Sequence, residues 1–511
     1  MAYGRPGVYI SERLLTAPIA AGNNAAAAGA VVAPFAHGPE IVTKVNSWYE
    51  FTQAFGGYNA AFPATFQVGA FFTNGGRELY VKRLLADDAD TASVNLVTSG
   101  DATVATVTAK NAGADGNNLR IVVSAGSVSN TYTLSVYKEA GVADTIVSNR
   151  VTAGAADDIL LERYENVVFD DSASSDFAET VVNIVSPNIA ISASAAGVPV
   201  SANYPLSGGS DGTTPVAADY TNYKGNSVSV FADFSTVNRP LVIFLPAVHS
   251  LLSDKVSVID AASSWSESNG GFVVVDTPPS QTVAQAISFA GSLTDTSNAA
   301  VYHPNIYIAD PVGRSSTSLR KIGPSGSIAG LYLANDSRIG SGVWKAPAGL
   351  NSPVVGVVAT EAAFTSADLD SMNSGTAPVN PIRQVPGAGV VVMGARTLLQ
   401  DGTANKYVNM RRSLIYIKQR LKDSTEFAIF ENNDERLWNR LNTVISTFLN
   451  DYRNQGGLRG ATPAAAYFVK VDSQNNTPTT IANGEVHIQV GVALEYPAEF
   501  IVIDLSQKTL N

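Results

Sequence analysis

The chain has 511 residues, of which 45% are hydrophobic and only 15% charged, enough for roughly three domain cores with few charges left to solvate the surface. Its formal net charge of −11 argues against general binding to nucleic-acid backbones, and the absence of cysteine excludes disulfides, thiolate metal sites and cysteine nucleophiles. No stretch is long and apolar enough to span a membrane, and the N-terminus has no signal core, so we expect synthesis in the cytoplasm.

Residues 1–20 form a first segment that contains a short strand signal from Val8 to Ile10, directly after Pro6-Gly7. No hairpin partner follows it in the sequence. This strand must therefore pair with a sheet edge elsewhere, in its own subunit or in another one.

Residues 21–86 alternate strand and helix signals. Strands are predicted at 31–34 and 79–84, and helices from Ser47 to Phe55 and over 64–74, each helix ended by a pair of glycines. This alternation is typical of an α/β domain.

Residues 87–210 change to a composition dominated by Thr, Val, Ser, Ala and Asn. Short alternating runs between turn residues predict a β-rich domain inserted into the first one. Its predicted strands are 103–108, 119–124, 132–137 and 181–185. The region is acidic, because residues 91–240 hold 15 acidic and 7 basic side chains.

Residues 211–370 return to α/β patterning and complete the central domain that begins at 21–86. Asn238–Pro246 and Gly271–Asp276 are continuous apolar runs, typical of parallel strands covered on both faces. The other elements predicted here are helices at 253–268 and 281–293 and a strand at 301–309.

Residues 371–484 are predicted to form a C-terminal domain around an amphipathic helix. Asn432 with Glu435 fits a capping box, and Gly456-Gly457 can end the helix in the left-handed conformation. Apolar residues recur at the spacing of one helix face: Leu437, Trp438, Leu441, Val444, Ile445, Phe448, Leu449 and Tyr452. The other elements predicted in this domain are strands at 389–393, 426–430 and 465–471 and a helix at 407–421.

The last segment, residues 485–511, contains strands at 486–494 and 500–505 separated by Pro497. The final strand has no local partner, like the first strand of the chain. Both ends of the chain therefore predict strands that need an edge to pair with.

Candidate catalytic groups are scattered. His37, His249, His303 and His487 have no carboxylate or second histidine at ligand spacing. The glycine-rich run Ile322–Gly330 lacks the lysine of a phosphate-binding loop and better fits a connector that lets backbones approach closely. We therefore expect no catalytic residue, metal or cofactor, while an acid–base pair assembled from distant positions stays open.

Charged motifs have two interpretations each. Asp87-Asp88-Ala89-Asp90 could hold a cation, but a solvated linker before the inserted domain is the stronger hypothesis. Arg411-Arg412 begins a helix and is either a solvated face or a subunit contact. Residues 401–460 hold 10 basic and 7 acidic side chains, so this region either assembles with the acidic one or is simply solvated.

An ordered set of motifs resembles the contractile tail sheath proteins of bacteriophages. Pro6-Gly7-Val8-Tyr9 matches the N-terminal signature of that family, and Ala112–Arg120 (AGADGNNLR) resembles the start of its inserted domain, with Asp115 where many relatives carry Trp. The other matching segments, in chain order, are 324–330, 342–348, 380–383, 387–397, 407–412, 430–433, 455–466 and 497–500. Each motif alone is weak, but the ordered set covers nearly the whole chain.

The resemblance implies a non-enzymatic, multidomain α/β (α+β mixed) tail-sheath fold with an outward-facing insertion, an inner-layer C-terminal domain and extended arms. Subunits would stack as hexameric rings around a tail tube and contract from a metastable state to drive the tube through the host envelope for genome ejection. The implied partners are further copies of this chain, the tail tube protein, and baseplate and tail terminator proteins, without nucleic acid or membrane insertion. The implied location is the virion, after assembly in the host cytoplasm.

The resemblance also assigns roles to residues. The inter-subunit arms would add strands to neighbouring sheets through Gly7, Val8, Tyr9, Ile10, Phe500, Ile501, Val502 and Ile503. The tube or a neighbouring subunit would be contacted by Arg436, Arg440, Arg453 and Arg459. Alternatives are the sheath of a tailocin or extracellular contractile injection system, a type VI secretion sheath, which is less favoured because it is split over two chains, and an α/β enzyme.

Overall fold

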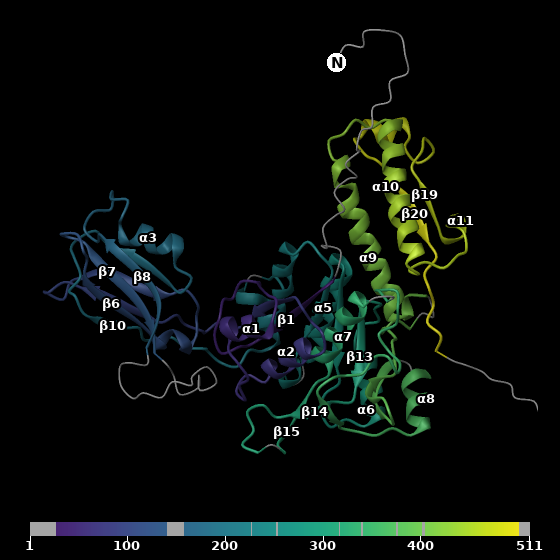
Figure 1. The fold of residues 1–511 in the computed structure, drawn as a ribbon, viewed down its shortest axis with the longest axis horizontal. Coiled ribbons are helices and arrows are strands. Elements are labelled where there is room, and N and C mark those ends of the chain that lie inside the picture. Colours follow the sequence, from purple (N-terminus) through teal and green to yellow (C-terminus); the bar gives the residue numbers. More distant parts are fainter. Residues whose placement is uncertain are drawn as a thin grey trace, which may run out of the picture.

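The structure is a computed structural model that describes residues 27–139, 158–225, 227–251, 254–315, 317–338, 341–374, 377–400 and 404–499. The arm residues Gly7–Ile10 and Phe500–Ile503 lie outside these ranges, as does the strand predicted at 500–505. Figure 1 shows three bodies: the inserted domain to one side of the central domain, and a C-terminal unit whose long helices extend away from the central domain in another direction.

An eight-stranded sheet forms the centre of the molecule. In spatial order its strands are β18 (Gly389–Val392), β17 (Val379–Val385), β13 (Ala299–His303), β12 (Gly271–Asp276), β11 (Leu241–Phe244), β1 (Ala28–Ala33), β3 (Leu79–Arg83) and β2 (Thr43–Val45). The six inner strands are parallel, and the two edge strands are antiparallel to their neighbours. The prediction of a mixed α/β fold is confirmed.

Helices cover both faces of this sheet, which is why β11 is apolar at every position and β12 carries no polar side chain before Asp276. One face is covered by α1 (Trp48–Phe55), α2 (Ala64–Thr73) and α7 (Ser325–Ser337). The other is covered by α4 (Ala217–Thr221), α5 (Lys255–Asn269), α6 (Val283–Gly291) and α8 (Ser366–Ser374). A small sheet of β14 (Ile306–Ala309), β15 (Leu319–Ile322) and β16 (Val357–Thr360) adjoins them.

The glycine-rich run at the start of α7 lets two helices pack backbone to backbone. A Cβ on Gly326 would lie 2.2 Å from the carbonyl oxygen of Gln67, and one on Gly330 would lie 2.3 Å from that of Phe71. Both carbonyls belong to α2. The predicted close backbone approach is confirmed, although residues 325–330 of this run lie in α7 and not in a connector.

In its described residues, the inserted domain has two small antiparallel sheets and one α-helix around a core of its own. One sheet holds β10 (Asn203–Pro205), β6 (Leu119–Ala125), β7 (Tyr132–Lys138) and β8 (Ile159–Val167). The other holds β4 (Ser93–Val97), β5 (Thr103–Ala109) and β9 (Ile189–Ala193), and the helix is α3 (Ala178–Val185).

Three predicted strands differ from the structure. Residues 181–185 belong to α3, where Ala178 and Val182 are buried one turn apart, as helix periodicity requires. Residues 426–430 form a short 3₁₀ turn, Glu426–Ala428, followed by exposed residues. The strand predicted at 301–309 is divided into β13 and β14, which belong to two different sheets.

The C-terminal unit begins later than residue 371, where the sequence analysis placed it. The strands β17 and β18 extend the central sheet, because β17 pairs in parallel with β13. The unit itself contains α9 (Val408–Thr425), α10 (Glu435–Asn454), α11 (Pro463–Ala466), β19 (Tyr467–Lys470), α12 (Pro478–Ala482) and β20 (Gln489–Val492).

A buried carboxylate holds the start of α7 against the sheet. Asp276, the last residue of β12, accepts hydrogen bonds from the backbone N–H of Ser325 at 2.5 Å and from its hydroxyl at 2.7 Å. The Ser325 hydroxyl also lies 2.8 Å from Oε1 of Gln67. Burial raises the pKa of Asp276 to about 7, although the hydrogen bonds from Ser325 and Gln67 oppose this shift.

We predict that Asp276→Asn becomes more stable relative to the natural chain as the pH rises from about 4 to about 7. An aspartate has a pKa of about 3.9 when unfolded, so the raised folded pKa makes the folded state bind the proton more tightly. The contribution of the protonated carboxyl is complete below the unfolded pKa and lost as pH rises through the folded pKa. The asparagine amide can donate to the Ser325 hydroxyl and does not ionise.

Urea unfolding of both proteins at pH 4.5 and 8 measures this difference. Other groups, including His249 and His303, also titrate in this range, so the quantity to compare is the stability of the variant minus that of the natural chain. A stability difference that is the same at both pH values would contradict the prediction.

Candidate assembly surface

Helix α10 is the framework of the C-terminal unit. The side chain of Asp434 caps it by accepting from the N–H of Leu437 at 3.0 Å, so the predicted cap at Asn432 was wrong by two residues. Gly456 follows the helix with a φ of 93°, which confirms the predicted glycine stop. The predicted apolar face is buried or half-buried throughout, with Val444 and Phe448 at its half-buried margin.

The apolar face of α10 packs against α9 and the β19–β20 pair to form a separate core. Tyr452 lies at its centre: its ring centroid is 5.5 Å from that of Tyr416 and 5.2 Å from that of Trp344. Its hydroxyl is 3.2 Å from the Ser413 hydroxyl of α9. Burial raises the pKa of Tyr452, so this hydroxyl stays protonated.

Strands β19 and β20 form a two-stranded antiparallel sheet, with no third strand among the described residues. The strand predicted at 465–471 is shorter in the structure, because Ala465 and Ala466 belong to the helical turn α11. Phe468 pairs with Gly491 across the sheet and remains 52% exposed. A sheet of two strands is marginal on its own and leaves backbone groups unpaired at its edges.

The four candidate contact arginines do not form one surface. Arg436 and Arg440 are exposed in the first turns of α10, where Arg440 lies over the ring of Phe427 at 4.1 Å. Arg453 and Arg459 lie at the other end of that helix, about 20–25 Å away along the axis at 1.5 Å per residue. The structure therefore divides them into two pairs.

Arg453 and Arg459 differ from each other in exposure. Arg453 is half-buried and donates to the carbonyl oxygen of Ala461 at 3.0 Å and to Oδ1 of Asn454 at 2.9 Å, so it holds the following loop onto the helix. Arg459 is exposed, and its backbone N–H donates to the carbonyl oxygen of Ala493 at 2.8 Å, just after β20. Of the two, Arg459 presents its guanidinium outward.

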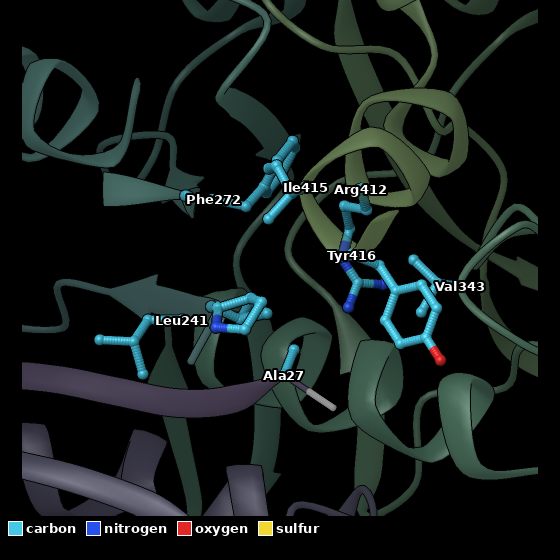
Figure 2. Close-up of a pocket in the computed structure, with 10 residues that line it drawn as sticks. Ala27, Leu241, Phe272, Val343, Arg412, Ile415 and Tyr416 are labelled. Atoms are coloured by element: carbon cyan, nitrogen blue, oxygen red, sulfur yellow. The ribbon is translucent and has the colours of Figure 1, made fainter. Parts of the chain in front are cut away.

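Helix α9 joins the C-terminal unit to the central domain. Val408 and Ile415 pack in the core of the central sheet, whereas Met410 and Ile417 pack in the core of the C-terminal unit. A small pocket lies in this joint, between α9 and the amino ends of β1, β11 and β12. Figure 2 shows Arg412 and Ile415 of α9 facing this pocket together with Phe272 of the sheet.

Arg412 carries the polar part of this joint. Its guanidinium forms two hydrogen bonds to the carboxylate of Asp336 on α7, at 3.0 and 2.5 Å, and lies 4.7 Å from the ring centroid of Tyr332. The Arg412 side chain is 4% exposed and that of Asp336 11%. Neighbouring Arg411 donates from Nε to Oδ1 of Asn298 at 3.0 Å. The solvated-face interpretation is therefore wrong for Arg412, which is buried, while the subunit contact stays a prediction.

The histidines do not form a catalytic or metal centre within the described ranges, where no three potential ligands cluster. His303 lies 2.8 Å from the hydroxyl of Thr277, and burial lowers its pKa to about 4. Burial also lowers the pKa of His249 to about 4. His487 is exposed, 2.9 Å from Glu485. None of the helices in the described chain has both the length and the apolarity to cross a membrane.

Sequence similarity places two domains of this chain in known families. A model of the phage tail sheath protein central domain matches residues 217–398, and a model of the phage tail sheath C-terminal domain matches residues 400–508. Together they cover more than half of the chain. The tail sheath protein of Vibrio phage KVP40 is 26% identical over 181 residues, 35% of this chain and 26% of that protein. The tail sheath protein of Enterobacteria phage T4 is 26% identical over 159 residues, which are 31% of this chain and 23% of that protein. The matches span about a quarter of these curated relatives.

Solved structures share the fold over nearly the full length. The helical sheath of the anti-feeding prophage in its contracted state has a TM-score of 0.58 and 20% identity, covering 99% of this chain and 100% of that one. The sheath complex of the extracellular contractile injection system PVC, also contracted, has a TM-score of 0.54 and 21% identity, covering 99% of each chain. A sheath tail protein from Listeria innocua has a TM-score of 0.61 and 15% identity, covering 89% of this chain and 91% of that one.

We predict that Arg412→Met destabilises the joint strongly, because it leaves the buried Asp336 carboxylate unpaired. Breaking a buried ion pair from one side typically costs about 3–5 kcal/mol. Removing both charges in Arg412→Met/Asp336→Leu should recover much of the loss, since neither charge then remains buried. Urea unfolding followed by near-UV circular dichroism gives the free energies.

Lys418→Met is the matched control, because Lys418 is an exposed cation on the same helix and should change stability by less than about 0.5 kcal/mol. Equal, small effects of Arg412→Met and Lys418→Met would show that the ion pair does not hold the joint.

Proposed function

Because this chain belongs to the phage tail sheath family, we propose that it is the structural subunit of a contractile tail sheath that polymerises as stacked hexameric rings around a tail tube. Its partners are other copies of the chain, the tube protein, and the baseplate and terminator proteins at the two ends of the tail. The inserted domain faces outward, and the C-terminal unit forms the inner layer. The subunit works in the virion, after assembly in the host cytoplasm.

The two-stranded β19–β20 sheet is the observation that supports this proposal most directly. Its strands have free edges among the described residues, and both ends of the chain carry strand-like segments without local partners. We propose that Gly7–Ile10 and Phe500–Ile503 add strands to such sheets on neighbouring subunits. Main-chain hydrogen bonds would then connect the subunits in a mesh. Each contact would join one surface of a subunit to a different surface of the next subunit, and repeated contacts of this kind generate an open helical assembly.

Contraction needs no nucleotide in this mechanism. The extended sheath is a kinetically trapped state, and contraction releases energy stored at assembly as subunits rotate as rigid bodies and form better contacts. The mesh of added strands keeps neighbouring subunits connected during the rotation. The motion drives the tube through the host envelope, and the genome is ejected.

A second candidate function is the sheath of an extracellular contractile injection system. The full-length fold similarity to the PVC and anti-feeding prophage sheaths favours it, whereas the curated sequence relatives are proteins of phages. Genes for a capsid and a terminase beside the gene of this chain would favour the phage tail. Their absence would favour the injection system.

We predict that deleting residues 1–15 or 500–511 leaves a folded subunit that cannot polymerise, because each deletion removes a proposed added strand and keeps every residue of the described cores. The C-terminal cut falls after Glu499, since this carboxylate accepts from Nε of Arg396 at 3.1 Å and from its Nη2 at 2.6 Å. Circular dichroism checks the fold, and sedimentation with negative-stain microscopy checks the polymer. Normal tubes from either truncated chain would contradict the role of that arm.

We further predict that Arg459→Glu weakens co-assembly of sheath and tube several-fold, because it reverses an exposed charge on the proposed inner layer. Arg453→Glu should weaken it too, but with a loss of stability, since Arg453 also holds its own loop. Co-sedimentation of each variant with purified tube measures the effect. Arg163→Glu, in the inserted domain, is the control for a charge reversal remote from the tube. Equal assembly of Arg459→Glu and the control would refute the contact.

A further inference from the structure

The inserted domain and the central domain have separate hydrophobic cores throughout the described chain. All buried apolar residues of the inserted core lie between Ala92 and Leu206, and none of the central core does. Figure 1 shows the inserted domain standing to one side of the central sheet, joined to it near β1 and α1. Domains without a shared apolar interface are expected to move relative to each other unless other contacts prevent it.

The linkers between the domains pair with each other. Oδ1 of Asp88 accepts from the N–H of Thr213 at 2.9 Å, and Asp90 and Ser210 exchange two backbone hydrogen bonds at 2.9 and 3.0 Å. The prediction of a linker at Asp87–Asp90 fits this geometry. This pairing makes the connection double, and all of these bonds join one linker to the other.

Arg83, the last residue of β3, reaches both domains with a side chain that is fully buried. On the central side its guanidinium donates to three carbonyl oxygens of the segment after β1. The bonds are Nε to Phe35 at 3.0 Å, Nη1 to Gly38 at 3.2 Å and Nη2 to Ala36 at 3.3 Å.

On the other side, the same guanidinium contacts the inserted domain and its return linker. Nη1 donates to the carbonyl oxygen of Ala112 at 2.6 Å, and Nη2 donates to Oδ1 of Asp211 at 3.3 Å. That oxygen also accepts from the N–H of Ala114 at 3.2 Å. A guanidinium has five N–H groups, and here five acceptors meet it, three from one domain and two from the other side.

Gly113 allows this close approach. Its φ is 124°, and a Cβ there would lie 2.6 Å from Oδ1 of Asp211 and 2.7 Å from Nη2 of Arg83. The position therefore needs glycine for its backbone conformation and for space. The AGADGNNLR segment thus begins with a carbonyl and a glycine fitted to the arginine of the other domain.

We propose that Arg83 is a positioning residue that fixes the inserted domain on the central domain, so that the two move as one rigid body. Its five hydrogen bonds remove the rotation that the paired linkers allow. In a sheath, this device would carry every rotation of the central domain to the outer surface. The geometry that supports it is internal to one subunit, so it stands or falls independently of the sheath function.

A distance measurement between spin labels tests the proposal. The natural chain has no cysteine, so Gln53→Cys on α1 and Thr180→Cys on α3, both exposed, place one label on each domain. Double electron–electron resonance on the full chain, diluted with unlabelled chain, gives the intramolecular distance distribution. We expect a single narrow peak with Arg83, and a distribution roughly twice as wide in Arg83→Gln, which cannot supply five donors.

Arg163→Gln is the matched control, because this arginine lies in the inserted domain with a side chain that is 55% exposed. It should leave the peak narrow, and Arg83→Lys, with three donors, should give an intermediate width. An Arg83→Gln distribution as narrow as that of the control, with normal circular dichroism, would overturn the proposal.

Gly113→Ala keeps the test decisive if Arg83→Gln does not fold. This variant keeps Arg83 in the sequence. Its added methyl group pushes the guanidinium away from the inserted domain. We expect a shifted or widened distance distribution with both domain cores intact. An unchanged distribution in Gly113→Ala would overturn the proposal.

Discussion

The division of this chain into separate hydrophobic cores is the constraint on which its other features depend. The central sheet buries its apolar residues on two faces, while the inserted domain and the C-terminal unit each have a core of their own. A core stabilises the residues inside it and does not orient a neighbour with which it shares no side chain. The relative positions of the three bodies therefore depend on what lies between the cores.

Two different solutions connect the bodies. The C-terminal unit shares α9 with the central domain, because this helix contributes apolar residues to both cores and places Arg412 against Asp336 between them. Among the described residues, the inserted domain shares no helix with the central domain and is joined to it through its paired linkers and the hydrogen bonds of Arg83. In both places a buried arginine reaches across the joint: Arg83 has acceptors on both sides, and Arg412 of α9 pairs with Asp336 of the central domain, so that breaking either contact is costly. A rigid subunit of this kind suits a machine in which contacts between subunits change and subunits do not.

Local patterns in the sequence predicted most elements and the mixed fold class. They failed where contacts outside the local segment determine the conformation or the burial of a residue. The apolar periodicity of α10 gave its buried face correctly, because that signal lies within the helix. The cap was misplaced because Asn432 and Asp434 are both suitable residues and only the entering backbone selects one. Residues 181–185 are too short a β-branched run to distinguish a strand from a buried helix face.

The candidate site was predictable only in part, for the same physical reason. Arg436, Arg440 and Arg459 are exposed as the helix and loop patterns suggested, but the separation of the four candidate arginines into two pairs follows from the length of α10. The burial of Arg412 depends on Asp336, which is 76 residues earlier, and that of Arg83 depends on Asp211, which is 128 residues later. No local pattern predicts the burial of either arginine, because each directly follows another basic residue, Arg411 before Arg412 and Lys82 before Arg83, as is typical of a solvated surface.

Negative-stain electron microscopy of the purified full-length chain tests the central claim most directly, since a sheath subunit is defined by the polymer that it forms. We predict striated tubes with a regular axial repeat and a central channel wide enough for a tail tube. Discrete monomers without any polymer, at concentrations and salt conditions that keep the chain folded, would contradict the account.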